Sequence, residues 1–394
     1  MTACKGRMRI DVELTIAFCG DIMLGSEVGE YMGSSTVGDW LSDVSGAWHG
    51  ADLLIANLES PCVMEAKAID GPPPELIFRA PASRLAELAE AGFSAVTLAN
   101  NHVLNCGPQG LLETKRGLDE VGIHYAGAGM NLDEALQPAF IPVGGLTVGL
   151  VAFCYGPPAG HVTPGVAPCE PKLMERALAA ARKEADLVIA TLHDGLEYSD
   201  VPPSRTRARF RFLAENGADI VVGHHPHVLQ GLEWHGQVPI AYSLGDLLFH
   251  NSLAHVTERN FSRMAMGRHG LNEIRRDPGK FGRGAVLTVH ISADQKSIQW
   301  HPFRQDSHLR PQLSQGDAKG EDLWRLEELS DALLNDHDPR HALADSVLEA
   351  ARLENWQSLS VPQILKLAMR PKWRYIPSGL RWLTRQIRGV RITS

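Results

Sequence analysis

Short apolar runs alternate with helical patterns along most of this chain of 394 residues. The runs are rich in Val, Ile, Leu and Ala, and each is followed by polar residues or glycine, which is typical of buried strands. They predict strands at 14–19, 53–56, 95–99, 148–153, 187–192, 220–222 and 240–244. Helical patterns occupy 81–91 and 171–185. Strands that alternate with helices of this length predict a layered α/β fold.

The polar residues that follow the predicted strands are of types that bind metal ions. The carboxyl ends of strands in α/β sheets meet at one edge, where such proteins bind their ligands. Here they carry Asp21, Glu59, Asn101, His102, His193, Asp194, His224, His225, His227 and Asp246. Carboxylate and amide oxygens suit Mg, Mn or Ca, and imidazole nitrogens suit Mn, Fe or Zn. We therefore expect a divalent metal site, with Ca, Mn, Mg and Zn as the candidate ions.

Six motifs in a fixed order strengthen this interpretation. They are FCGDIMLG, ANLESP, TLANNHVLNCG, TLHDGLEY, GHHPHVLQGLE and IAYSLGDLLF. Together they resemble the capsule-synthesis CapA family, a branch of the calcineurin-like metallophosphoesterase superfamily. The resemblance covers residues 10–305 and implies a two-sheet α/β sandwich flanked by helices, with the metal site at the strand ends. Residues 306–394 would form a helical C-terminal extension.

The resemblance also implies roles for single residues. It implies metal binding by Asp21, Glu59, Asn101, His225 and His227. It implies acid–base chemistry by the strand-end residues His102, His193 and His225, and two departures from the family pattern add Asp194 and Asp246 as catalytic candidates. Asp and Asn also favour turns after strands, so a turn-capping role for the acidic and amide residues is the competing interpretation.

Several positions depart from the family pattern. Met23 stands where the superfamily has a histidine ligand, which favours one metal over two. Asn105 stands where a CapA-like chain has aspartate, so we expect His102 to lack an orienting partner. Asp194 and Asp246 replace an aromatic residue and an asparagine. Each could form a new His/Asp pair, which would set the imidazole tautomer and raise its basicity; each could equally be a solvated turn carboxylate.

These departures favour proton exchange at carbon over ester hydrolysis. Hydrolysis in this superfamily uses two metals and a histidine that protonates the leaving group. Proton exchange needs a base, an acid on the opposite face and a cation. The chain resembles the metal-dependent peptide epimerases of lasso-peptide pathways, which implies L-to-D epimerisation of a residue in a ribosomal precursor peptide. The alternatives are a metallohydrolase of phosphoesters or poly-γ-glutamate amides, or a metal-containing scaffold protein of capsule biosynthesis.

Three further residues are candidates for contact with a substrate. Arg79 precedes a predicted helix and could bind a substrate carboxylate by a two-pronged hydrogen bond, although a surface salt bridge would also explain it. Glu197 and Tyr198 follow the His193 segment and could shape the same pocket or simply pack.

Composition excludes some partners and compartments. The formal net charge of −8 argues against a general nucleic-acid binder, which would carry a basic face. The six cysteines form no C-x-x-C pair and are interpreted as free thiols of a reducing compartment. The run 14–19 is too short for a secretory signal, and no transmembrane segment is predicted. We therefore expect a cytoplasmic protein.

The last ninety or so residues have a different character. Residues 321–356 have helical periodicity that is interrupted near Asp338 and Pro339. The end, 371–394, holds six basic and no acidic side chains, with an apolar stripe formed by Leu380, Leu383, Ile387 and Val390. This stripe could pack on the acidic main domain, contact an anionic membrane surface or bind an acidic peptide partner.

Overall fold

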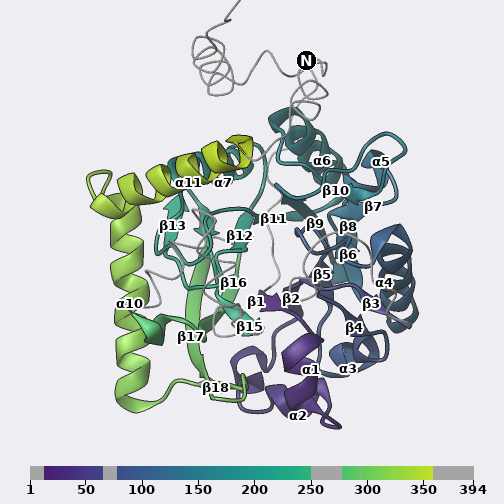
Figure 1. The fold of residues 1–394 in the computed structure, drawn as a ribbon, viewed down its shortest axis with the longest axis horizontal. Coiled ribbons are helices and arrows are strands. Elements are labelled where there is room, and N and C mark those ends of the chain that lie inside the picture. Colours follow the sequence, from purple (N-terminus) through teal and green to yellow (C-terminus); the bar gives the residue numbers. More distant parts are fainter. Residues whose placement is uncertain (1–12, 65–77, 250–276, 294, 358–394) are drawn as a thin grey trace, which may run out of the picture.

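Two β-sheets stacked against each other form the centre of the computed structural model, which describes residues 13–64, 78–249, 277–293 and 295–357 (Figure 1). The first sheet has eight strands. In spatial order, they are β18 (Pro311–Leu313), β17 (Lys296–Gln305), β16 (Arg283–Ile291), β1 (Leu14–Ile22), β2 (Leu53–Leu58), β5 (Ala95–Thr97) and β6 (His124–Ala126), with β15 (Asp246–Leu248) paired to β1. Strands β1, β2, β5 and β6 are parallel, so their carboxyl ends share one edge.

The second sheet has six strands, four of them parallel. Their order is β13 (Leu232–His235), β14 (Val238–Ala241), β12 (Ile220–His224), β11 (Leu187–His193), β9 (Leu146–Cys154) and β8 (Ala139–Val143). Strands β14, β12, β11 and β9 are parallel to one another. Two short pairs complete the strands, namely β10 (Gly165–Val166) with β7 (Ala128–Gly129) and β3 (Cys62–Val63) with β4 (Ala80–Pro81).

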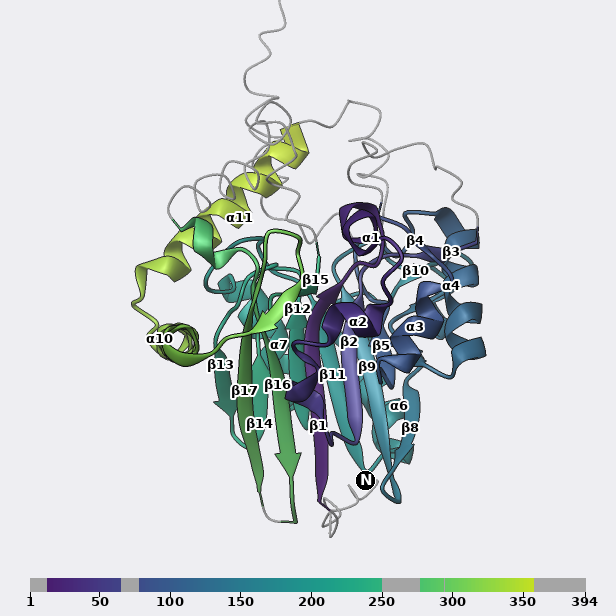
Figure 2. The same ribbon diagram turned by 90° about the horizontal axis from the view of Figure 1, so that it is seen from below.

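Helices cover the sandwich, as Figure 2 shows. They are α1 (Ser26–Met32), α2 (Val37–Leu41), η1 (Ser45–Trp48), α3 (Arg84–Glu90), α4 (Gly107–Val121), α5 (Leu132–Ala135), α6 (Pro171–Glu184), α7 (Ser204–Glu215), η4 (Pro278–Lys280), α10 (Gly316–Leu334) and α11 (Pro339–Gln357). The expected α/β sandwich of two sheets flanked by helices is therefore confirmed. No helix in the described ranges combines the length and the apolar composition that crossing a membrane requires.

The main core lies between the two sheets. Ile16 and Val96 of the first sheet and Ile189 and Val222 of the second are fully buried in one apolar cluster. A second cluster joins the other face of the six-stranded sheet to α6 and α7. Burial on both faces explains why these strands read as continuous apolar runs rather than as alternating ones.

One predicted strand ends in the wrong place. The run 240–244 predicts a strand leading to Gly245, but β14 ends at Ala241 and Asp246 begins a new strand, β15, beside β1. Gly245 has a φ of 69°, which a residue with a side chain adopts only with strain. A Cβ on Gly20 would lie 1.8 Å from the Gly245 carbonyl oxygen, so glycine at 20 permits β1 and this turn to meet. The turn brings Asp246 level with Asp21 in the parallel register.

The C-terminal helices pack on the sandwich. The chain turns between α10 and α11 where the sequence predicts a break, near Asp338 and Pro339. Leu326 and Leu329 of α10 are buried against Leu229 and Ala285 of the main body. The basic segment 371–394 lies outside the described residues.

Candidate metal centre

Two buried carboxylates, one from each of two neighbouring strands, form the middle of the site. Asp21 lies near the end of β1 and Glu59 directly follows β2, and both are almost completely shielded from solvent. The Nδ2 of Asn57 donates to Asp21 Oδ1 at 2.9 Å and to Glu59 Oε2 at 3.1 Å. Its Oδ1 accepts from Thr97 and Asn100 at 3.0 and 3.2 Å. Asn57 therefore holds both carboxylates in place.

Sequence reasoning missed this role of Asn57. The residue belongs to the strand that Glu59 follows and lies two positions before Glu59, so the two side chains leave the chain on the same face. The spacing of two residues between Asn57 and Glu59 could have indicated this role from the sequence.

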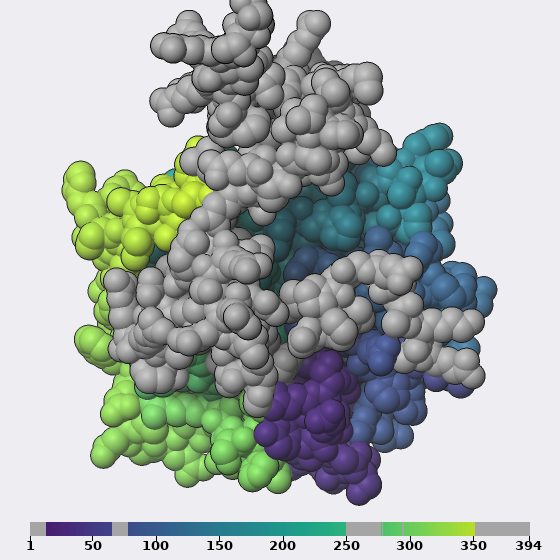
Figure 3. Space-filling model, in the orientation of Figure 1, coloured from purple at the N-terminus to yellow at the C-terminus, as the bar shows by residue number. Residues whose placement is uncertain are grey.

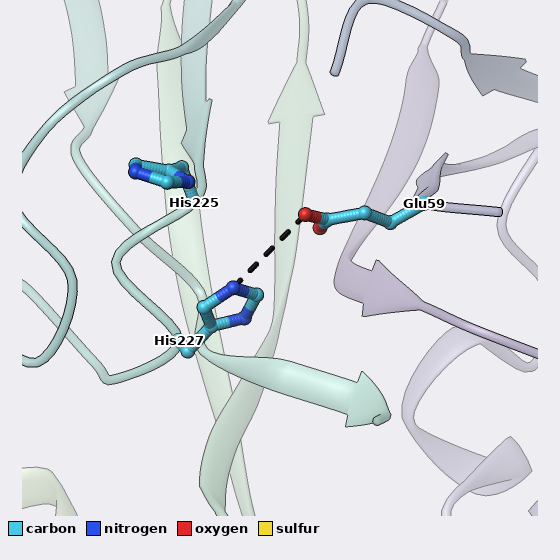
Figure 4. Close-up of side chains that lie close together, drawn as sticks. All are labelled: Glu59, His225 and His227. Atoms are coloured by element: carbon cyan, nitrogen blue, oxygen red, sulfur yellow. Dashed lines mark ion pairs between the residues drawn. The ribbon is translucent and has the colours of Figure 1, made fainter. Parts of the chain in front are cut away.

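Three imidazoles surround one oxygen of Glu59. Glu59 Oε1 lies 3.5 Å from Nε2 of His193, and 4.0 Å from Nε2 of both His102 and His227. Figure 4 shows Glu59 and His227 facing each other, with His225 beside them. Within the described part of the chain, Oε1 is buried and accepts no hydrogen bond. Burial and the neighbouring Asp21 raise the pKa of Glu59 well above its usual value.

The histidine segment at the end of β12 contacts Asp21. His224 Nδ1 lies 3.0 Å from Asp21 Oδ1, and the backbone N–H of His225 donates to Asp21 Oδ2 at 3.1 Å. Burial opposes ionisation of Asp21, but the hydrogen bond from His224 and the nearby imidazoles lower its pKa. His225 and His227 have φ values of 100° and 55°, a strained conformation for residues with side chains that is often found at functional sites.

Asp246 forms the His/Asp pair that its place in the sequence predicts. Its Oδ1 lies 2.8 Å from Nδ1 of His227, and both side chains are buried. Burial raises the pKa of Asp246 to about 6, although His227 opposes the shift. Burial lowers the pKa of His227, but the charges of Asp246, Glu59 and Asp21 outweigh it, so the pKa lies well above its usual value.

These side chains fit a divalent cation. Three overlapping groups each hold ligand atoms within 4.8 Å of one another: Asp21 with Glu59 and His193, Asp21 with His227 and Asp246, and Glu59 with His225 and His227. A buried carboxylate oxygen without a donor is costly, and a bound cation would remove that cost. Mixed carboxylate and imidazole ligands suit Mn or Zn as well as harder ions.

His102 has an orienting partner, so the expectation that it lacks one is wrong. Its Nδ1 lies 2.9 Å from Asn105 Oδ1, the atom that also accepts the backbone N–H of Phe78 at 2.8 Å. Because that atom accepts from a backbone N–H, it is the amide oxygen, and His102 must carry its proton on Nδ1. Burial lowers the pKa of His102 to about 4. Its Nε2 therefore carries a lone pair facing Glu59.

Asp194 neither pairs with His193 nor forms a solvated turn carboxylate, the two possibilities that the sequence left open. Its carboxylate forms an ion pair with Arg209 and accepts a hydrogen bond from Thr206 at 3.4 Å. Successive residues at a strand end point to opposite faces, so Asp194 and His193 diverge. His193 instead has its Nε2 2.8 Å from Asn101 Oδ1.

The three residues predicted to contact a substrate differ in their exposure and in their contacts with the histidines of the centre. Arg79 is exposed and follows Phe78, whose ring centroid is 4.0 Å from that of His102. Glu197 is half-buried, and desolvation raises its pKa against the effect of His227. Tyr198 is buried, with its ring centroid 6.2 Å from that of His227.

Tyr155 is a second residue that sequence reasoning missed. It follows β9 directly, its hydroxyl lies 3.2 Å from His225 Nε2, and the two ring centroids are 5.0 Å apart. The side chain is nevertheless 46% exposed. Its position just after a strand of the second sheet was the signal, and an exposed phenol at a buried imidazole can reach a substrate.

Comparison with known proteins supports the expected family. The model of the family described as bacterial capsule synthesis protein PGA_cap matches residues 15–251. The PGA biosynthesis protein CapA of Bacillus subtilis is 31% identical over 247 residues, which cover 61% of this chain and 64% of that protein. The capsule biosynthesis protein CapA of Bacillus anthracis is also 31% identical, over 61% of each chain. This chain therefore spans less than two thirds of the length of these curated relatives.

The likeness of this chain to solved structures is weaker than its likeness to the CapA proteins. A structure described as a novel phosphatase from Mycoplasma pneumoniae aligns with 76% of this chain and 97% of its own at 12% identity and a TM-score of 0.47. The structure of a Thermus thermophilus protein, TT1561, aligns with 73% of this chain and 99% of its own at 11% identity and a TM-score of 0.38. We infer no activity from likeness at this level. The family match over most of the sandwich, which includes every residue of the centre, shows that this chain belongs to the bacterial capsule synthesis protein PGA_cap family.

Proposed function

We propose that this protein is a metal-dependent peptide epimerase, which exchanges the α-proton of one peptide residue and inverts that residue from L to D. The contact between His102 and Asn105 carries the proposal. A leaving group is protonated by an imidazolium, which a carboxylate partner would stabilise. The amide of Asn105 orients the ring and, unlike a carboxylate, carries no charge, so its hydrogen bond only partly offsets the lowering of the pKa by burial. His102 is therefore neutral near pH 7 with its proton on Nδ1, so its Nε2 can accept a proton and holds none to give to a leaving group.

The residues that would hold the cation are Asp21, Glu59, Asn101, His225 and His227, with His193 and Asp246 within reach. When bound, a divalent cation would stabilise the negative charge that develops on a substrate carbonyl oxygen as the neighbouring α-proton leaves. The expected ions remain Ca, Mn, Mg and Zn.

An acid is needed to return a proton to the opposite face of the α-carbon. Tyr155 is suited to this role because its hydroxyl is held by His225, and because it follows a strand of the second sheet whereas His102 follows a strand of the first. The described residues provide no hydrogen bond to His225 Nδ1, which leaves that nitrogen as the one available to a cation. Nε2 would then carry the proton and donate to the Tyr155 oxygen. The phenol proton of Tyr155 would remain available to the substrate.

The proton balance of this proposal is complete. His102 takes the α-proton, and the electron pair of the broken C–H bond passes into the neighbouring carbonyl. Tyr155 then gives its proton to the opposite face of the same carbon, which restores the carbonyl and leaves phenolate. Solvent returns a proton to Tyr155 and removes one from His102 before the next turnover.

The substrate that we propose is a ribosomal precursor peptide of the lasso type. Arg79, which is exposed and adjacent to Phe78 beside His102, would bind the carboxylate of this peptide. Glu197 and Tyr198, which lie near His227, would contact the same peptide. We propose a cytoplasmic location, since a precursor peptide is made there.

Family membership favours a second candidate function. The two Bacillus relatives are named for PGA and capsule biosynthesis. The same strand-end ligands could serve a metallohydrolase of phosphoesters or of poly-γ-glutamate amides, or a non-catalytic role in capsule synthesis.

Deuterium incorporation distinguishes these candidates. The protein, loaded with Ca, Mn, Mg or Zn in separate samples, is incubated in D2O with candidate peptides that end in a free carboxylate or an amide. We expect one deuteron at one α-carbon, with inverted configuration, and loss of incorporation with chelator or in His102→Ala. His235→Ala is the matched control, because His235 pairs with Glu215 at the surface. Absence of deuterium uptake together with turnover of a phosphodiester or a glutamyl amide would reject the epimerase.

A further inference from the structure

Helices α10 and α11 contact the loop that carries two of the proposed substrate-contact residues. This loop, residues 194–203, connects β11 to α7 and includes Glu197 and Tyr198. The family match ends at residue 251, so both helices lie beyond it. In Figure 3 they form the flank coloured light green to yellow. We propose that this helix pair positions the 194–203 loop against the candidate metal centre, with Arg325 and Asp200 as the positioning residues; the catalytic consequence rests on the proposed function.

Apolar packing joins the loop to both helices. Leu196 and Val201 of the loop are fully buried in one small cluster with Ala332 of α10 and Ala344 of α11. This cluster is separate from the main core between the sheets. Leu196 and Val201 therefore pack against the extension, whereas Tyr198 packs against Val228 and Phe281.

A chain of charged contacts leads from α10 to the backbone of Tyr198. Arg325 Nη2 lies 3.0 Å from Asp200 Oδ2, and Lys280 Nζ lies 3.3 Å from Asp200 Oδ1. The same Lys280 Nζ donates to the Tyr198 carbonyl at 3.0 Å. Arg325 of α10 thus contacts Asp200 of the loop, and Lys280 links Asp200 to the backbone of Tyr198 in the same loop.

The end of the loop that leads into α7 is also attached to the C-terminal helices. Asp345 of α11 accepts hydrogen bonds from the backbone N–H of Ser204 at 2.8 Å and from its hydroxyl at 2.6 Å, at the first residue of α7. Arg207 of α7 donates to the carbonyl of Leu333, near the end of α10, at 3.0 Å. Both the middle and the end of the loop are therefore attached to the extension.

The loop in turn contacts the histidine segment. The backbone N–H of Tyr198 donates to the carbonyl of Pro226, which lies between His225 and His227, at 2.8 Å. Gln230 Nε2 donates to the Ser199 carbonyl at 2.7 Å. Tyr198 has a φ of 64°, a conformation that surrounding contacts must hold. Loss of the contacts from α10 should release Tyr198 from His227.

Hydrogen–deuterium exchange of the full-length protein tests this inference without any assay of activity. We expect Arg325→Ala to raise the exchange rate of amides in 194–203 by about tenfold, with little change in the strands of the main core. Arg325→Lys, which keeps the charge near Asp200, should restore most of the protection. Glu327→Ala is the control, because Glu327 is an exposed neighbour on the same helix. Unchanged exchange in Arg325→Ala would overturn the proposal.

A second variant and a kinetic measurement keep the test decisive. Asp200→Asn weakens both ion pairs from the loop side, so it replaces Arg325→Ala if that variant fails to fold.

In the peptide deuteration assay, both variants should lower kcat severalfold more than they change KM, with partial rescue by Arg325→Lys. If wild-type protein deuterates no peptide, the proposed function fails, while the exchange of loop amides still decides the positioning role. Faster loop exchange with unchanged kcat and KM would reject the link to catalysis.

Discussion

His102 and Asn105 are joined by a hydrogen bond of 2.9 Å in which the amide oxygen of Asn105 faces Nδ1 of the imidazole. The amide determines the tautomer and the orientation of the ring, as a carboxylate would, but adds no negative charge. The pKa of His102 remains low, at about 4, because burial is not offset by an anion at Asn105. Asn105 therefore fixes the orientation of the imidazole without raising its pKa as much as a carboxylate would.

Asn105→Asp should convert His102 into a more basic group. A carboxylate at this position raises the pKa of His102, so more of the imidazole is protonated near neutral pH. Since the proposed base must be neutral, the acidic limb of the pH profile of kcat/KM should move to higher pH. The pH dependence of α-carbon deuteration measures this shift. An unchanged acidic limb would show that His102 is not the base.

His102 should make metal-free protein less stable as the pH falls from 7 to 5. The pKa of His102 is lowered to about 4 from the ordinary value of 6.5. Its unfolded state binds more protons between these values, so stability is present above pH 6.5 and declines as pH falls toward 4. We expect His102 to account for about 2 kcal/mol of the loss between pH 7 and pH 5. Urea denaturation at both pH values should show a smaller loss in His102→Gln than in the wild type and in His235→Ala.

Asp246→Asn should weaken binding of the cation. The carboxylate holds His227 Nδ1 at 2.8 Å and lies among possible ligands itself. Loss of such a partner typically lowers metal affinity about 10- to 100-fold. Titration calorimetry with Mn²⁺ measures the change, and Asp133→Asn serves as the control because Asp133 pairs with Arg176 at the surface. Equal affinity in the two variants would argue against a role of Asp246 at the centre.

Asn57→Ala should destabilise the metal-free protein more than the metal-bound one. The substitution removes the donor shared by Asp21 and Glu59 and leaves buried polar groups of Thr97 and Asn100 without their acceptor. We expect a loss of roughly 3 kcal/mol without metal. Urea denaturation with and without Mn²⁺ gives the two values, and Asn216→Ala, at an exposed helix end, is the comparison. A loss that metal does not reduce would contradict a cation shared by the two carboxylates.

Tyr155→Phe should lower kcat by about 100-fold with little change in KM, because the ring remains and only the proposed proton donor is lost. The defect should appear as α-proton exchange without inversion, since His102 can still remove and return a proton on its own face. Chiral analysis of deuterated peptide separates exchange from inversion. Tyr31→Phe, at an exposed position, is the control. Full inversion by Tyr155→Phe would exclude Tyr155 as the acid.

Local sequence alone located strands β1, β2, β5, β9, β11, β12 and β14 and the polar residues that follow them, but not strands such as β16 and β17. Strands buried on both faces are apolar throughout, so each can be located along the chain from its own sequence. The positions of Asp21, Glu59 and His193 at or near the ends of such runs can be recognised in the same way. The motif around His225 and His227 is similarly local. These features required no knowledge of which strands become neighbours.

Tertiary structure decided which of these side chains meet. Asp246 reaches His227 only because a turn at Gly245 starts a new strand beside β1. Asp194 turns to Arg209 because consecutive residues at a strand end diverge, and the extension, which has no motif, positions the 194–203 loop through contacts between residues far apart in sequence. Local periodicity records the face on which a residue lies, whereas its partner depends on strand register and on long-range packing.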